Sequence, residues 1–93
     1  RQVLGTHRQW NVALIGVGNL GRALLNYGGF RARGFLITDL FDSDPAIIGT
    51  PIDEWTIHSI DELPVIAKQR PLELAVLSVP AHAAHAVAQK VQE

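Results

Sequence analysis

The chain has 93 residues and a formal net charge of −1, and its composition is 47% hydrophobic and 18% charged. This length fits one small domain, and the composition is typical of an ordered globular chain. The sequence excludes a membrane span, since no apolar run is long enough. The absence of cysteine excludes a disulfide framework and a thiolate site. The scattered basic residues exclude the charge pattern of a nucleic-acid-binding module. Because the chain lacks methionine and opens on Arg1, we expect a piece of a larger protein.

The first predicted unit is a buried strand followed by a glycine-rich turn and an apolar helix. Residues 12–15 form a continuous apolar run, which is typical of a strand buried on both faces. Apolar side chains then recur at helical spacing from Leu20 to Tyr27, and Gly28 and Gly29 predict the end of that helix. Because the strand is followed so closely by the helix, the glycines between them are predicted to form a tight turn.

The turn has the pattern G-x-G-x-x-G, with glycines at 16, 18 and 21. In a dinucleotide site the first glycine allows the sharp turn, the second lets a pyrophosphate approach the backbone, and the third lets the helix pack on the strand. The first N–H groups of the helix lack intrahelical partners and carry partial positive charge, so an anion is the natural occupant. The alternative is a turn that only packs. The predicted cofactor-binding residues of this turn are Gly16, Val17, Gly18, Asn19, Leu20 and Gly21.

The second predicted strand spans residues 35–41 and is followed by Asp42. An acidic residue at the end of this strand, about twenty residues past the glycines, accepts hydrogen bonds from the adenosine ribose. Asp39 also lies in range, but it falls inside the strand, where a buried carboxylate needs partners that the sequence does not reveal. We therefore assign the ribose to Asp42. Residues 43–67 contain no lysine or arginine to hold a 2′-phosphate, which favours NAD(H) over NADP(H).

Two connections flank the second strand. Before it, residues 30–34 are interpreted as a basic loop exposed to solvent. The alternative is that the arginines of this loop bind an anion. After it, Asp44 and Pro45 match the N-cap and first position of a short helix that Gly49 ends. We therefore expect a loop before the strand and a helical turn after it.

A third strand is predicted at residues 55–58, followed by a helix. Ser59 and Glu62 match a capping box, and the helix continues through Ala67. Acidic residues in a first helical turn also complement the helix dipole. The carboxylates of Asp61 and Glu62 are therefore interpreted as structural and not as an acid/base pair.

The fourth predicted strand spans residues 74–79 and ends at Pro80. Because the carboxyl ends of neighbouring parallel strands meet at one edge of the sheet, Ser78, Val79 and Pro80 are expected beside the glycine turn, as cofactor-binding residues. A final alanine-rich helix is predicted over residues 82–93.

No catalytic or metal site is predicted. His82 and His85 are three residues apart on the last predicted helix, but the spacing supplies no third ligand. Ser78 lies beside a strand end that a proline terminates, which is not the setting of a nucleophile elbow. The expected pocket edge at residues 78–81 thus offers no strong general acid or base, and together with the family resemblance given below this predicts a switch and not a catalyst.

The order of these elements predicts the first half of a Rossmann fold, an α/β doubly wound parallel sheet with strand order 3-2-1-4. Short motifs accompany this order, at residues 16–21, Tyr27, 41–45, 48–49, 60–63 and 79–81. With these motifs the chain resembles the redox-sensing repressor Rex. The resemblance covers most of the chain, from about Trp10 to the last helix. The domain also resembles the CoA-binding domain of succinyl-CoA synthetases.

The resemblance implies a bacterial, cytoplasmic, homodimeric repressor that reads the NADH/NAD⁺ ratio and leaves operator DNA when NADH binds. It implies that residues 1–93 are only the NAD(H)-binding core, with the DNA-binding winged helix before it and dimerisation elements after it. By position, the turn from Gly16 to Gly21 would hold the pyrophosphate, Asp42 the ribose, and Val79 with Pro80 the nicotinamide side.

The sequence departs from the family pattern at a few positions, including Asp39, Ile47 and Ser78, of which the last stands in place of a threonine. Two other functions remain open. The chain could be the cofactor-binding half of an NAD-dependent dehydrogenase, or the CoA-binding domain of a ligase.

Overall fold

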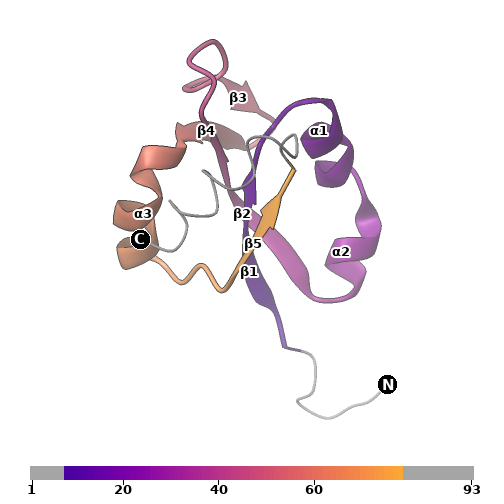
Figure 1. Cartoon of the computed structure of the whole chain (residues 1–93). Helices are drawn as coiled ribbons and strands as arrows, with labels where there is room; N and C mark the ends of the chain where they lie inside the picture. The colour runs from indigo at the N-terminus through magenta and orange to yellow at the C-terminus, as the bar shows by residue number, and fades with distance from the viewer. Residues whose placement is uncertain (1–7, 79–93) are drawn as a thin grey trace.

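The structure is a computed structural model that describes residues 8–78 (Figure 1). A five-stranded sheet forms its centre, with α1 and α2 on one face and α3 on the other. No helix in this part of the chain is long and apolar enough to cross a bilayer. The elements are β1 (Trp10–Ile15), α1 (Asn19–Leu25), α2 (Gly28–Ala32), β2 (Phe35–Asp42), β3 (Pro51–Ile52), β4 (Trp55–Ser59), η1 (Ile60–Glu62), α3 (Leu63–Gln69) and β5 (Leu74–Leu77).

The strand order is β3-β4-β2-β1-β5. β1 pairs in parallel with β2 and β5, and β2 pairs in parallel with β4. These four strands are the predicted ones, so the predicted order 3-2-1-4 is confirmed. The sequence did not predict β3, a two-residue strand that pairs antiparallel with β4 at the edge of the sheet.

The sheet is buried by two apolar layers, one on each face. The alternation of side chains along β1 supplies both layers, as the continuous apolar run predicts. The layer under α3 contains Ala13, Ile15, Phe41, Ile60, Leu63 and Ile66. The layer under α1 contains Leu14, Val17, Leu40 and Ile57.

The short helix expected after β2 is reduced to a single turn. Asp44 accepts the N–H of Ala46, as a cap would, and its carbonyl accepts the N–H of Ile48 at 3.1 Å. The N–H of Gly49 then donates to Ile57 and the N–H of Ile57 donates to Thr50, so the chain forms backbone hydrogen bonds with β4 from Gly49 onward. Pairing with β4 therefore begins where the turn ends.

The loop expected before β2 is partly helical. α1 ends at Leu25, and α2 begins at Gly28, the residue that the sequence assigned to a helix end. Tyr27 precedes α2 and is exposed instead of lying on a buried stripe of α1. Its ring meets Phe30 edge-on, with centroids 5.1 Å apart, which supports a turn of helix here. Gly34, with φ of 86°, makes the reversal into β2.

A bulge at Thr38 accounts for the acidic residue inside β2. Val12 pairs with Ile37 but Ala13 pairs with Asp39, so Thr38 is an extra, exposed residue. Asp39 is 3% exposed. Its carboxylate accepts from the Thr38 hydroxyl at 2.8 Å and pairs with the Arg70 guanidinium, at the end of α3, at 2.7 Å. The buried carboxylate thus has the partners that the sequence alone could not supply.

Candidate nucleotide-binding site

The glycine turn lies at the carboxyl edge of the sheet, where the chain crosses from β1 to α1. β1 sits between β2 and β5 in the sheet. The chain passes from β1 outward to β2 and β4, and later returns to the other side of β1 as β5. Open α/β sheets bind ligands at such a switch point, in the crevice beyond the carboxyl ends of the strands.

The three glycines of the turn have different structural demands. Gly16 has a φ of 98°, which favours glycine. A Cβ on Gly21 would collide with the carbonyl oxygen of Gly16 and lie 3.0 Å from the Ser78 hydroxyl. Gly18 has a φ of −90°, which any residue adopts, and a Cβ there would meet no heavy atom of residues 8–78 within 4 Å. This part of the chain therefore requires glycine at 16 and 21 but not at 18.

The start of α1 presents backbone donors to the same crevice. Arg22 is the first residue whose N–H bonds back into the helix, to Gly18 at 2.9 Å. No side chain among the described residues caps this end, and its first turn holds no acidic residue. The N–H groups from Gly18 to Gly21 therefore have no hydrogen-bond partners within the helix, and they lie at its positive end. An anion has the complementary charge and acceptors.

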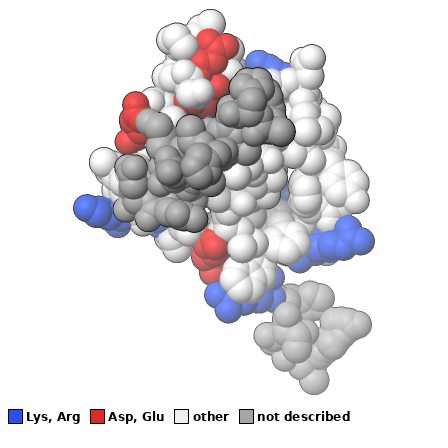
Figure 2. All heavy atoms as spheres, viewed as in Figure 1, with Lys and Arg blue, Asp and Glu red and all other residues white. Residues whose placement is uncertain are grey.

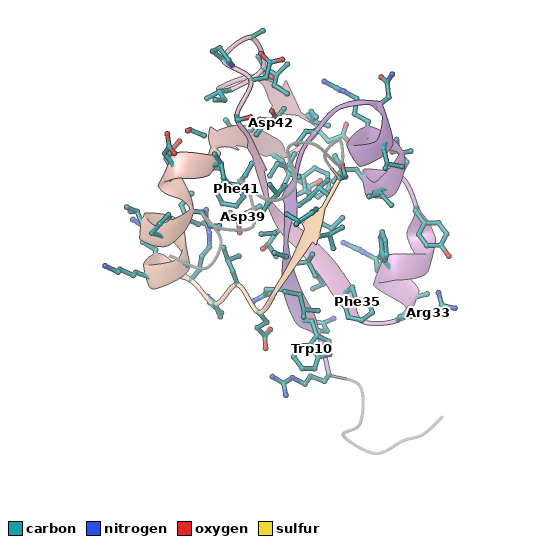
Figure 3. All side chains as sticks on the ribbon, viewed as in Figure 1. Trp10, Arg33, Phe35, Asp39, Phe41 and Asp42 are labelled. Atoms are coloured by element: carbon teal, nitrogen blue, oxygen red, sulfur yellow. The ribbon has the colours of Figure 1, made fainter. Side chains whose placement is uncertain are left out.

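Asp42 lies at the end of β2, beside the glycine turn, and Figure 3 places it at the opposite end of the sheet from Trp10. One carboxylate oxygen accepts the Val17 N–H at 2.7 Å and the other accepts the Asp44 N–H at 2.8 Å. A carboxylate has about four lone-pair sites, so both oxygens can accept further hydrogen bonds. Asp42 therefore anchors the turn and keeps capacity for a hydroxyl group.

Ser78 directly follows β5 and also reaches the turn. Its hydroxyl donates to the Gly16 carbonyl at 2.7 Å, and its N–H donates to Ile15 at 2.8 Å. The sequence placed Ser78 at the edge of the site but gave no signal for this bond, which depends on how β5 pairs with β1. Val79, Pro80, His82 and His85 lie outside the described residues.

Other acidic side chains at this edge have structural partners. The Ser59 hydroxyl accepts the Asp61 N–H at 3.2 Å, and the Glu62 carboxylate accepts the Ser59 N–H at 3.1 Å. The predicted capping box is confirmed. Among residues 8–78, no three histidine or acidic side chains come together as a metal-binding group. Figure 2 shows the charged side chains of this face in small, separate groups of either sign.

A parallel sheet with a glycine turn at its switch point and an acidic residue ending the next strand defines a Rossmann-like domain. The chain belongs to the CoA binding domain family, whose model matches residues 7–93.

The chain is also similar to redox-sensing repressors. It is 42% identical to the redox-sensing transcriptional repressor Rex of Desulfitobacterium hafniense, over 97% of this chain and 43% of that relative. Two crystal structures of RSP, a Rex-family repressor, also match. The complex with NAD⁺ and operator DNA has a TM-score of 0.83 at 26% identity, over 95% of this chain and 41% of that one. The complex with NADH has a TM-score of 0.82 at 26% identity, over 94% and 42%. The resemblance to Rex is thus confirmed, and the chain spans less than half the length of these proteins.

Proposed function

We propose that this chain is the NAD(H)-binding core of a redox-sensing transcriptional repressor, whose full-length dimer leaves operator DNA when NADH binds. The observation that carries the proposal is Gly18. Neither its backbone conformation nor its contacts with residues 8–78 require a glycine, and none of those residues occupies the space where its side chain would lie. A missing side chain beside N–H groups that have no partner within the helix leaves room for a pyrophosphate to contact the backbone.

The remaining contacts follow from the geometry of the turn. The N–H groups from Gly18 to Gly21, which include those of Asn19 and Leu20, hold the pyrophosphate, while the Val17 N–H of the same turn holds Asp42. Asp42 accepts a hydroxyl of the adenosine ribose through its free lone pairs. Asp44 is a second acidic residue two positions after Asp42 in the chain, and residues 43–67 carry no lysine or arginine. A 2′-phosphate would be repelled there, which supports NAD(H) as the ligand instead of NADP(H). The nicotinamide side is assigned to Val79 and Pro80 from their position in the sequence, since they lie outside the described residues.

We further propose that the domain senses its ligand without catalysing a reaction. A ligand shifts a conformational equilibrium only through its different affinities for the two states. NADH and NAD⁺ differ in the charge and planarity of the nicotinamide, so the site can distinguish them. The output then passes to a preceding winged-helix domain that binds operator DNA and to following elements that form the homodimer. Residues 1–93 are the nucleotide-binding core of this cytoplasmic protein. The repressor relatives support this, because the chain matches only 43% of their length.

Replacement of Gly18 by valine in the full-length protein tests whether the pyrophosphate binds at this position. Because a Cβ at this position meets no atom of the described residues, we expect an unchanged circular dichroism spectrum and thermal midpoint. NADH binding measured by calorimetry should disappear, since the branched side chain occupies the approach of the pyrophosphate. Gly28→Val is the matched control, because a Cβ at Gly28 also meets no atom of residues 8–78 within 4 Å. If Gly18→Val binds NADH as tightly as the wild type does, the pyrophosphate does not bind at Gly18 and the proposal is contradicted.

A further inference from the structure

One peptide group of the glycine turn is held at both ends by side chains from two different strands. The carbonyl of Gly16 accepts the Ser78 hydroxyl at 2.7 Å, and the N–H of Val17 donates to Asp42 at 2.7 Å. These two groups belong to the same peptide unit. Asp42 ends β2 and Ser78 follows β5, the two neighbours of β1 in the sheet. The Gly16–Val17 peptide therefore joins the ends of three strands.

This peptide needs side-chain support because of the residue that precedes it. Gly16 has a φ of 98°, and a glycine restricts its own backbone less than any other residue does. A peptide that rotated by half a turn at this position would exchange its two ends, so the Gly16 carbonyl oxygen would face the Asp42 carboxylate in place of the Val17 N–H. A carbonyl oxygen in that place would repel the carboxylate and remove one of its two backbone donors. The orientation of this single peptide thus decides whether Asp42 is held beside the turn.

The structure shows how the carbonyl is held on the side of the peptide away from Asp42. The Ser78 hydroxyl draws the Gly16 carbonyl toward the end of β5, against the backbone of Gly21. A Cβ on Gly21 would occupy the place of this carbonyl and would also crowd the Ser78 hydroxyl. Gly21, which leaves space for the Gly16 carbonyl, and Ser78, which donates to it, therefore both keep this carbonyl in its observed position.

We propose that Ser78 is a positioning residue that fixes the Gly16–Val17 peptide, so that the Val17 N–H holds the Asp42 carboxylate in place for the ribose hydroxyl of the ligand. The inference rests on the proposed function and changes the role of Ser78 in it. The serine hydroxyl acts on the ligand through the turn instead of contacting the nicotinamide ring.

Two ligands separate these roles. ADP-ribose carries the same adenosine and pyrophosphate as NADH but lacks the nicotinamide. We expect Ser78→Ala, made in the full-length protein, to weaken both ligands by the same factor, roughly twofold to tenfold, the effect of one hydrogen bond. Ser78→Thr retains the hydroxyl and should bind both ligands like the wild type. Thr38→Val is the matched control, since it removes a hydroxyl that bonds within the bulge of β2, away from the turn. Calorimetry measures both affinities, and circular dichroism checks the fold.

The outcomes distinguish the inference from the proposed function. A loss confined to NADH, with ADP-ribose unchanged, shows that Ser78 contacts the nicotinamide and overturns the inference. Unchanged affinity for both ligands overturns it as well. If Ser78→Ala does not fold, Ser78→Thr and Ser78→Val make the same comparison, because they differ only in the hydroxyl. A wild-type protein that binds neither ligand contradicts the proposed function itself.

Discussion

Replacement of Asp42 by alanine should impair both the folded turn and the binding of NADH. In the unliganded protein the carboxylate accepts two backbone N–H groups, those of Val17 and Asp44. Hydrogen bonds to charged groups contribute about 1.5–3 kcal/mol each, but Asp42 is half-buried, so water replaces part of the loss. We expect the free energy of unfolding to fall by about 1–3 kcal/mol. The loss of the ribose acceptor should weaken NADH binding by about 1–3 kcal/mol more, roughly fivefold to 150-fold.

Urea unfolding and calorimetric titration of the full-length protein separate these two effects. Glu54→Ala is the control, because it removes one exposed carboxylate in the turn between β3 and β4 without touching the glycine turn. It should leave both quantities unchanged. The wild type should bind NADPH far more weakly than NADH. Equal affinity for NADPH and NADH, or full NADH affinity in Asp42→Ala, would refute the role given to Asp42.

Two further predictions concern stability. Arg70→Ala should destabilise the protein by roughly 1–3 kcal/mol in urea unfolding, because Asp39 stays buried without its cationic partner. The double variant Asp39→Leu, Arg70→Met should recover most of that loss, and a double variant as unstable as Arg70→Ala would contradict this account of the pair. The Asn11 N–H and then the Arg8 guanidinium lower the pKa of Glu73 from its ordinary value of 4.5. Its stabilising contribution is therefore present above pH 4.5 and lost as the pH falls through the lowered pKa. Glu73→Gln should lower the thermal midpoint at neutral pH, and the difference from the wild type should vanish in acid; a difference that persists in acid would refute this origin.

The sequence predicted the parts of the site that depend on local spacing. The strand before Gly16, the helix after it and the place of Asp42 follow from residues close together in the chain, and the four parallel strands lie in the predicted order. It could not predict contacts that depend on register between distant strands. The bond from Ser78 to Gly16 requires β5 to pair with β1, and these residues are 62 positions apart.

Asp39 shows the same limit within one strand. A strict alternation along β2 would set Ile37 and Asp39 on the same face, and the bulge at Thr38 changes this. The partner of Asp39, Arg70, comes from the far end of α3, which no spacing rule connects to β2. The helix expected at Pro45 is limited to one turn for a related reason. Its local signals were correct, as the Asp44 bond to Ala46 shows, but from Gly49 onward the backbone pairs with β4, a contact that local spacing does not reveal.

The central claim is that the nucleotide controls binding to DNA. A gel-shift titration of the full-length protein on its operator, with NADH and NAD⁺ added separately, tests it most directly. We predict that NADH releases the DNA, that NAD⁺ does not, and that Gly18→Val remains bound in the presence of NADH. Operator binding that is indifferent to NADH, or steady hydride transfer from NADH to an added 2-oxo acid, would contradict the account in favour of a dehydrogenase.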